Sequence, residues 1–208
     1  MTSSKINKRD VELLVSKIPP HPNPKIFLEQ YLTPPEVVAD IVWLAFLRGE
    51  IKGKRVADLG CGTGRFCAAA SFLGAYCACI EIDNDSITLA KKVFKDLGID
   101  ADFINADVEY FYSQSKFDTV IENPPFGVKR KGYDLIFLNS ALDLSNDVVY
   151  SIHKSNEKSE KIIKNIARKK GFSSEVITTN FEIGYYYPWH RNEIHKFLVD
   201  IYLFKKIT

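Results

Sequence analysis

Short apolar runs alternate with amphipathic stretches along most of the chain. The apolar runs predict strands at residues 55–59, 76–82, 102–105, 117–122 and 148–152, and a closing pair of strands at residues 175–181 and 196–204. The stretches with helical spacing predict helices at residues 65–72, 85–97, 134–144 and 155–170, the last opened by a Ser155 cap. Strands that alternate with helices in this way indicate an α/β fold, with a mostly parallel seven-stranded sheet and helices on both faces.

The first part of the chain has a different pattern. A short amphipathic helix is predicted at residues 8–17, and four prolines within residues 19–24 separate it from the rest. At residues 33–36, Thr-Pro-Pro-Glu predicts a helix start with Thr33 as the cap of a capping box. We therefore expect an N-terminal helical arm and proline-rich linker at residues 1–30, and a single domain at residues 31–208.

The composition is that of a globular protein: 208 residues, 46% of them hydrophobic and 26% charged. This excludes a disordered, collagen-like or coiled-coil chain. No run approaches the roughly 20 apolar residues that span a bilayer, and no apolar region follows the first basic residues, so we expect no membrane segment and a cytoplasmic location. The four cysteines fall at positions 61, 67, 77 and 79 without the spacing of a zinc site, and we expect free buried thiols and no metal.

Charge is distributed unevenly along the chain. Residues 56–125 carry 5 basic and 11 acidic side chains, whereas residues 151–208 carry 11 basic and 6 acidic ones. The small net charge of +2 therefore hides a basic C-terminal part that could meet phosphate, although a solvated helix face would give the same pattern.

A glycine-rich loop at residues 58–64, Asp-Leu-Gly-Cys-Gly-Thr-Gly, joins a predicted strand to a predicted helix. In open α/β sheets, ligands bind at such strand ends. The loop has neither the GxGxxG spacing nor the lysine of a phosphate-binding loop, and an acidic side chain at its start would repel an anion. It favours a cationic sulfonium, S-adenosylmethionine, over a dinucleotide. The candidate cofactor residues here are Asp58, Gly60, Gly62, Thr63 and Gly64.

Further carboxylates follow the next two strands. Glu81 could accept both ribose hydroxyls of the cofactor while Asp83 caps the next helix, or the two could exchange these roles. Asp107 could accept the adenine amino group, or could instead cap a helix, and Val108 could contact the adenine ring. We favour Glu81 for the ribose, because Asp83 is placed to cap the next helix, and Asp107 for the adenine.

The segment Asn123-Pro124-Pro125-Phe126 follows the fourth predicted strand. The exocyclic amine of a nucleobase is a poor nucleophile because its lone pair is delocalised into the ring. The Asn123 side-chain oxygen and the Pro124 carbonyl could hold its two hydrogens and direct the lone pair to the methyl group, while Phe126 stacks on the ring. Pro125 stiffens this loop. A plain proline-rich turn is the alternative interpretation.

These motifs make the chain resemble the class I S-adenosylmethionine-dependent methyltransferases, and more closely the methyltransferase-like protein 5 family with its archaeal members. The matching segments are Leu28-Glu-Gln-Tyr31 with Thr33, residues 57–62, Glu81 with Asp83, Asp107-Val108, residues 117–120 and 123–127, Ser151-Ile-His-Lys154, and residues 199–204. The resemblance implies a Rossmann-like fold and methylation of adenosine N6 in structured RNA, with small-subunit rRNA as the expected substrate. It also implies that Gln30, Tyr31 and Thr33 close over the cofactor and that Lys154 lies near the RNA.

The resemblance further implies a partner, a small zinc-ribbon activator subunit that extends the sheet along the strand at residues 102–105. The family commonly has aspartate where this chain has Glu81, and a lysine run where residues 191–193 stand. We call residues 123–126 the reactive loop. Independently of the family, three basic residues follow it and are candidate RNA-binding residues, namely Lys129, Arg130 and Lys131. Aromatic residues at 185–189 could stack on unpaired bases or pack in a hairpin, and the pair His190 and His195 is not expected to bind metal.

Three other functions remain open. Guanine N2 presents the same chemical problem as adenine N6, so an RNA guanine methyltransferase fits the motif. Glutamine-amide methyltransferases that act on release factors use a similar Asn-Pro-Pro turn, usually with tyrosine in the fourth position. A non-catalytic module that keeps the fold for RNA or partner docking is the third possibility.

Overall fold

The computed structural model describes residues 6–184 and 194–207, and its centre is one seven-stranded sheet. The strand order is β3-β2-β1-β4-β5-β7-β6, in which β3 to β5 are parallel and β7 pairs antiparallel with both β5 and β6. The predicted α/β fold with a mostly parallel seven-stranded sheet is therefore confirmed. The order reverses between β1 and β4, which is where open α/β sheets bind ligands.

The elements follow the predicted alternation closely. The strands are β1 Arg55–Leu59, β2 Tyr76–Glu81, β3 Asp102–Asn105, β4 Phe117–Glu122, β5 Ser145–Lys154, β6 Phe172–Gly184 and β7 Ile194–Lys206. The helices are α1 Lys8–Ser16, the 3-10 helix η1 Ile26–Leu28, α2 Pro35–Leu47, α3 Arg65–Phe72, α4 Asn84–Leu97, α5 Tyr133–Leu144 and α6 Glu157–Lys169. The last three strands are longer at both ends than their apolar runs predicted, because ladder pairing continues through polar residues.

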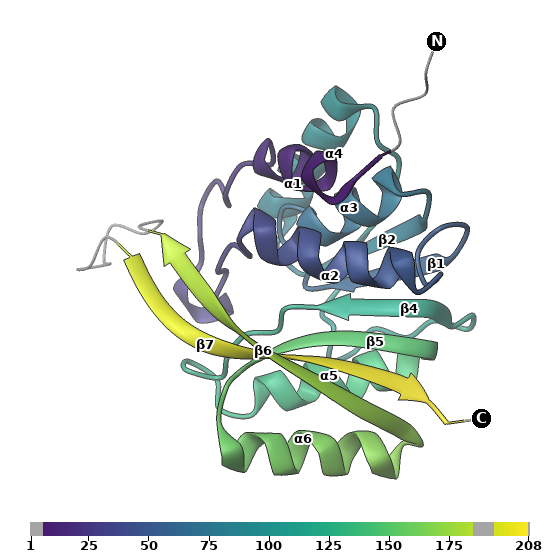
Figure 1. Ribbon diagram of the computed structural model, residues 1–208. Helices are drawn as coiled ribbons and strands as arrows, with labels where there is room; N and C mark the ends of the chain where they lie inside the picture. The colour runs from purple at the N-terminus through teal and green to yellow at the C-terminus, as the bar shows by residue number, and fades with distance from the viewer. Residues whose placement is uncertain (1–5, 185–193, 208) are drawn as a thin grey trace.

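Helices cover both faces of the sheet, as Figure 1 shows. Helices α1 to α4 lie on one face and α5 and α6 on the other. Alternate residues of one strand point to opposite faces, so Val56 packs into the first core and Ala57 into the second. Both residues are fully buried. Packing on both faces therefore holds β1 in place and fixes the position of the strand ends at which the site lies.

The N-terminal arm packs on the domain. Helix α1 contacts α2 and α3, and Val11, Val15 and Ile18 are at most 1% exposed within the first core. Asn7 caps α1 by accepting from Arg9 N and Asp10 N. The proline-rich segment that follows therefore connects two parts that share one hydrophobic core.

Two predicted helix caps are wrong. Thr33 does not cap α2, whose N-cap is Pro34 without a side-chain hydrogen bond; the Thr33 hydroxyl binds Asn123 instead. Ser155 does not cap α6, because Asn156 occupies the cap and accepts from Lys158 N and Ser159 N. In each case the cap is shifted by one residue from the predicted position.

The four cysteines are free and buried, and the described residues contain no cluster of His, Cys, Asp and Glu arranged to hold a metal ion. Within residues 6–184 and 194–207, no helix is both long enough and apolar enough to cross a bilayer.

The packing of α1 can be tested with Val15→Ala. Val15 is fully buried, so removing two carbons should lower the free energy of unfolding by about 1–2.5 kcal/mol, as measured by chemical denaturation. Leu13→Ala is the matched control on the same helix, since Leu13 is 48% exposed and should cost less than about 0.5 kcal/mol. Equal effects of the two substitutions would show that α1 does not pack on the domain in solution.

Candidate functional site

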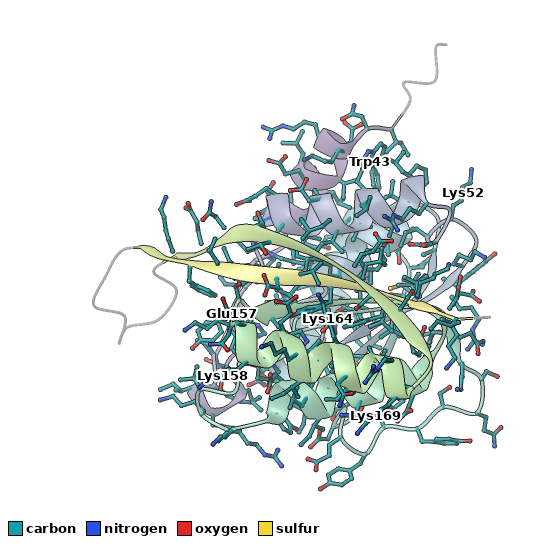
Figure 2. The ribbon with its side chains drawn as sticks, turned by 60° about the horizontal axis from the view of Figure 1, so that its bottom comes forward. Trp43, Lys52, Glu157, Lys158, Lys164 and Lys169 are labelled. Atoms are coloured by element: carbon teal, nitrogen blue, oxygen red, sulfur yellow. The ribbon has the colours of Figure 1, made fainter. Side chains whose placement is uncertain are left out.

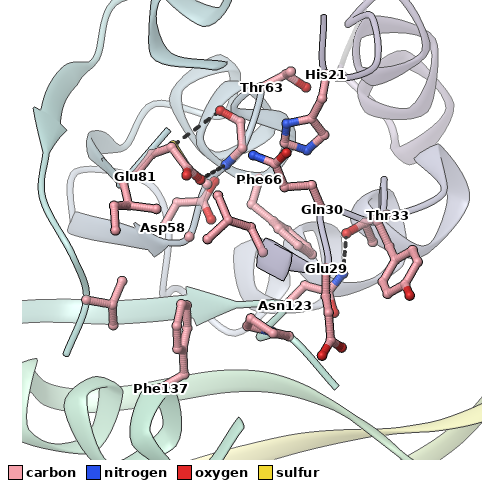
Figure 3. Close-up of a pocket in the computed structure, with 18 of the residues that line it drawn as sticks. His21, Glu29, Gln30, Thr33, Asp58, Thr63, Phe66, Glu81, Asn123 and Phe137 are labelled. Atoms are coloured by element: carbon pink, nitrogen blue, oxygen red, sulfur yellow. Dashed lines mark hydrogen bonds between the residues drawn. The ribbon is translucent and has the colours of Figure 1, made fainter. Parts of the chain in front are cut away.

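A cavity opens at the carboxyl ends of β1, β2 and β4, and the N-terminal arm closes it from the other side (Figure 3). We call it the cofactor cavity. Twelve of the residues that the sequence singled out line it: Gln30, Tyr31, Thr33, Asp58, Gly60, Gly62, Thr63, Glu81, Asp107, Val108, Asn123 and Pro125. They come from segments up to 95 residues apart, which the parallel topology brings to one edge of the sheet.

The glycine loop turns tightly against the end of β2. Gly62 has a φ of +56°, and a Cβ there would lie 2.8 Å from His21 Cε1, so only glycine fits under this ring. Gly62 N donates to Glu81 Oε2 at 2.8 Å, and Asp83 N donates to Glu81 Oε1 at 2.8 Å. Glu81 therefore orders the loop as well as facing the cavity.

Gly64, also a candidate cofactor residue, does not line the cofactor cavity. It is the N-cap of α3, with a φ of +86°. A Cβ at this position would lie 2.8 Å from the Phe94 ring. This glycine therefore serves the packing of α3 against α4.

Asp58 lies at the bottom of the cavity and is 2% exposed. Burial raises its pKa to about 7, although the hydrogen bond from Cys67 N acts in the opposite direction. The carboxylate is close to its titration point at neutral pH, and a cation bound nearby would favour its ionised form. His21 adds no competing charge, because burial lowers its pKa to about 4.

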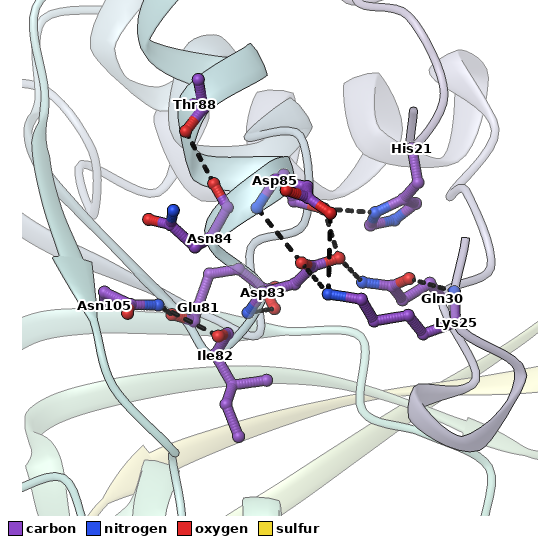
Figure 4. A network of polar contacts seen from close by, with 11 residues as sticks. His21, Lys25, Gln30, Glu81, Ile82, Asp83, Asn84, Asp85, Thr88 and Asn105 are labelled. Carbon is purple, nitrogen blue, oxygen red and sulfur yellow. Dashed lines mark hydrogen bonds and ion pairs between the residues drawn. The ribbon is translucent and has the colours of Figure 1, made fainter. Parts of the chain in front are cut away.

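Asp83 caps α4, as predicted, and also holds the arm (Figure 4). Its carboxylate accepts from Gln30 Nε2 at 2.7 Å and from Lys25 Nζ at 2.5 Å. Burial alone would raise the pKa of Asp83, but these two hydrogen bonds hold it below its ordinary value. Asp83 does not line the cofactor cavity, whereas Glu81 does. Asp83 thus takes the helix-cap role, and Glu81 is left facing the cavity.

Asp107 and Val108 follow β3 at the far end of the cavity. Asp107 Oδ1 accepts from Glu109 N and from the Tyr133 hydroxyl, both at 3.0 Å. It therefore caps a turn while facing the cavity, and the helix cap that was its alternative role is absent from this part of the described chain. Val108 is 3% exposed and forms part of the wall.

The side chain of Asn123 joins β4 to the arm. Its Nδ2 donates to Thr33 Oγ1 at 2.9 Å, which leaves Oδ1 as the remaining polar atom. Oδ1 is buried and has no hydrogen-bond partner. A buried acceptor without a partner is costly, so a substrate N–H donor would remove an existing penalty.

The other residues of the reactive loop, 124–126, do not all face the same cavity. Pro125 lines the cofactor cavity, but Pro124 and Phe126 do not. Pro124 is buried. The Phe126 ring lies 6.1 Å from Tyr31 in a stacked arrangement and lines a second cavity on the side of α6. Phe126 thus stands at the boundary between the two cavities.

The basic loop beside the site is tied to the arm and to the β3 side. Lys129 N donates to Glu29 Oε1 at 2.6 Å. Arg130 pairs with Glu109 at 3.0 Å and stacks over the Tyr133 ring at 4.0 Å. Lys131 is exposed. These contacts position the loop near the cofactor cavity, although none of its three basic residues lines it.

Lys154 is exposed and lines the second cavity, with its Nζ 6.0 Å from the Phe197 ring. The aromatic segment at residues 185–189 and His190 lie outside the described residues, as do residues 191–193, where the family has a lysine run. The side chain of His195 lies outside them too.

Several lining residues escaped sequence reasoning. Arg65 is 8% exposed and donates to Thr33 O at 2.6 Å and Ile18 O at 2.9 Å, which ties the arm to the start of α3. His21, Glu29 and Phe137 also line the cavity. Glu29 stands in a matching segment but was given no role, and no local pattern marks the other three, because each reaches the site through long-range packing.

The charges of the cavity favour a cationic ligand. Four carboxylates line it, namely Glu29, Asp58, Glu81 and Asp107. The guanidinium of Arg65 donates to backbone carbonyls, and His21 is neutral. A pyrophosphate would be repelled, whereas the sulfonium, ribose hydroxyls and adenine amine of S-adenosylmethionine fit these acceptors.

Comparisons with known proteins agree with this geometry. Residues 41–167 match the family model described as Methyltransferase small domain. The rRNA N(6)-adenosine-methyltransferase Mettl5 of Drosophila melanogaster is 32% identical over 97% of this chain and 98% of that protein. An uncharacterized protein of Methanocaldococcus jannaschii is 34% identical over 97% of this chain and 95% of its own length.

A solved structure is similar over the whole length. A candidate RNA methyltransferase from Pyrococcus horikoshii superposes with a TM-score of 0.89 at 36% identity, covering 99% of this chain and 100% of that one. Together with the family model and the full-length relatives, this shows that the chain belongs to the Methyltransferase small domain family and, within it, to the METTL5 group.

Proposed function

We propose that the protein transfers a methyl group from S-adenosylmethionine to the exocyclic N6 of an adenosine in structured RNA, with small-subunit rRNA as the substrate. The observation that carries this proposal is the buried Oδ1 of Asn123, an acceptor without a partner beside a cavity rich in carboxylates. The METTL5 relatives are named rRNA N(6)-adenosine-methyltransferases and match nearly the whole chain. The family assignment therefore supports the same reaction and the same substrate class.

The residues act mainly by positioning. Asn123 Oδ1 and the carbonyl of Pro124 accept hydrogen bonds from the two hydrogens of the amine. This moves the nitrogen toward tetrahedral geometry, so that its lone pair is less delocalised into the ring. Phe126 limits the orientation of the base, and the target nucleotide has to be unstacked to enter. S-adenosylmethionine supplies a methyl group on a positively charged sulfur. No strong base is required, since the amine loses its proton after the transfer, and most of the acceleration comes from alignment.

Each part of the cofactor would meet a side chain of the cavity. Glu81 would accept from the ribose hydroxyls, Asp107 would accept from the adenine amine, and Val108 would contact the ring. Asp58 would balance the positive charges of the cofactor's ammonium and sulfonium groups. Gln30, Tyr31 and Thr33 close the cavity from the arm, and Thr33 also fixes the orientation of Asn123.

We also propose a zinc-ribbon activator as partner at the β3 edge. Strand β3 pairs only with β2 in the described sheet, so its other edge offers free backbone groups to an added strand. The loop that follows exposes Tyr110 and Tyr112, at 78% and 79%. Exposed aromatic side chains next to an unpaired edge favour a protein interface.

Asn123→Ala tests the reaction. Loss of the amine acceptor should lower methyl transfer by at least about 100-fold, with the affinity for S-adenosylmethionine changed less than threefold. Labelled cofactor and total RNA are incubated with each protein, and the nucleosides are identified by mass spectrometry. Asn84→Ala, at an exposed position of α4, is the matched control.

The location of the label distinguishes the candidate reactions. Label in N6-methyladenosine supports the proposal, and label in N2-methylguanosine selects a guanine methyltransferase. Label in protein alone selects a glutamine-amide methyltransferase, and no label with intact cofactor binding selects a non-catalytic module. Transfer that persists in Asn123→Ala would remove the assigned role of Asn123.

A pH prediction follows from Asp58. Since its pKa is about 7, the carboxyl is neutral below pH 6 and ionised above pH 8 in the free protein. S-adenosylmethionine carries a net positive charge, so its affinity should rise about tenfold from pH 6 to pH 8 in calorimetric titrations. Asp58→Asn should flatten this dependence, whereas Asp96→Asn, an exposed control, should not. An affinity that is independent of pH in the unchanged protein contradicts the role of Asp58.

The partner interface is tested by co-expression with a zinc-ribbon activator and size-exclusion chromatography. Replacing Tyr110 and Tyr112 together by serine should weaken the complex at least about tenfold, because both rings are removed from the interface. Leu47→Ser, 67% exposed at the end of α2, is the control that should leave it intact. A thermally stable, fully active monomer that does not bind the activator would refute the interface.

A further inference from the structure

A second cavity of about 420 Å³ lies beside Phe126, between the end of β5 and the start of α6. We call it the flanking cavity. None of the residues that line it also lines the cofactor cavity. Asn123 and Pro125 face the cofactor cavity, whereas Phe126 lines the flanking cavity, so the reactive loop separates the two.

The inner wall of the flanking cavity carries an acceptor that the protein does not satisfy. His153 is 2% exposed, and its Nδ1 has no hydrogen-bond partner. Asp134 Oδ2 lies 3.7 Å from this nitrogen, too far for a hydrogen bond. Both residues line the flanking cavity.

A buried chain of hydrogen bonds determines what His153 offers. Ser151 Oγ donates to Glu122 Oε1 at 2.7 Å, and it lies 2.8 Å from His153 Nε2. The Ser151 hydroxyl hydrogen is directed to Glu122, so in the neutral form of the imidazole Nε2–H donates to the Ser151 oxygen. Nδ1 is then an acceptor, and it stands beside a second acceptor, Asp134. Two neighbouring acceptors without a donor between them call for a ligand that brings one.

The mouth of the flanking cavity has the opposite character. Lys154 and Lys158 are both exposed there, and the hydroxyls of Ser155 and Ser159 stand beside them. Lys158 lies in the first turn of α6, whereas Lys169 projects from the other end of the same helix (Figure 2). An anionic group at the mouth would meet two cations and the positive end of the helix dipole.

We propose that the flanking cavity is a subsite for a second ribonucleotide of the RNA strand, next to the nucleotide that is methylated. Its phosphate is held by Lys154 and Lys158, and its donor group, a ribose 2′-hydroxyl or a base amine, hydrogen-bonds to His153 Nδ1 and Asp134. The subsite rests on the proposed function, since it assumes that the methyl acceptor is RNA and that Phe126 lies between the two nucleotides.

The combination of groups argues against simpler ligands. A free phosphate would be attracted to the two lysines but repelled by Asp134 deeper in the cavity. A metal ion would meet the carboxylate and the imidazole but also the lysine charges. A ribonucleotide carries an anion and a neutral donor a few ångströms apart, and the aromatic Phe126 can pack on its base.

The test measures RNA affinity, so it does not require that methylation occurs. A single-stranded RNA oligonucleotide labelled with a fluorophore is titrated by anisotropy at several salt concentrations. Lys158→Gln should weaken binding about fivefold and reduce the salt slope by about one, because one phosphate contact is lost. Lys169→Gln removes the same charge from an exposed position on the same helix and should change neither. Cofactor affinity should stay constant in both.

A second variant addresses the inner wall. His153→Phe keeps an aromatic ring against Tyr202, whose ring centroid lies 5.5 Å from that of His153, but it removes Nδ1. The unchanged protein should bind RNA more tightly than DNA of the same sequence, and His153→Phe should abolish this preference if the donor is the 2′-hydroxyl. If the donor is a base amine, the preference stays and the variant instead loses discrimination between cytosine and uracil homopolymers.

Equal effects of Lys158→Gln and Lys169→Gln overturn the subsite, and so does a salt slope that neither variant changes. If His153→Phe does not fold, the lysine pair still decides. The nucleoside assay on the unchanged protein reports separately on the proposed function. Suppose that label appears in N6-methyladenosine but Lys158→Gln and Lys169→Gln change RNA affinity equally. The proposed methyltransferase activity would then stand, and only the subsite would be refuted. Lys158→Gln could instead weaken the binding of a protein partner and leave the salt slope of RNA binding unchanged. That result would assign the cavity to a protein segment and would also refute the proposal.

Discussion

The hydrogen bond from Asn123 Nδ2 to Thr33 Oγ1 decides which end of the amide remains for the proposed methyl acceptor. With the NH₂ group engaged by the arm, only Oδ1 is left, and it is buried without a partner. An amide free to rotate could present a donor to the incoming amine and would repel it. The site therefore depends on contact between two segments 90 residues apart, and any change that moves the arm away also removes the orientation of Asn123.

Much of this architecture could be predicted from the sequence, because its signals are local. The alternation of apolar runs with helical spacing predicted every strand and helix of the sheet domain, and chain order placed the loops after β1, β2, β3 and β4 at one edge. Asp58, Glu81 and Asp107 follow from that rule, since each lies within two residues of the carboxyl end of a parallel strand. Their chemical types then indicated the charge of the ligand.

The errors arise where tertiary contacts override local preference. Thr33 precedes two prolines and a glutamate, which is a good capping sequence, but its hydroxyl accepts from Asn123 in place of a backbone N–H of α2. Gly64 belongs to the loop motif, but its conformation serves the approach of Phe94. Sequence spacing could not distinguish these uses, because the competing partners lie 90 and 30 residues away.

The backbone of Glu29 shows what holding the arm in place requires. It is the only non-glycine residue with a positive φ in the part of the chain that the structure describes, at 50°, and such a conformation costs about 1 kcal/mol or more. Glu29 is 6% exposed, and its carboxylate accepts from Lys129 N at 2.6 Å, in the loop that follows residues 123–126. The strained turn thus aims one carboxylate at the basic loop, while the adjacent Gln30 reaches Asp83 on the cofactor side. Because these two neighbouring residues bind both loops, packing of the arm orders the cofactor cavity and the basic loop together.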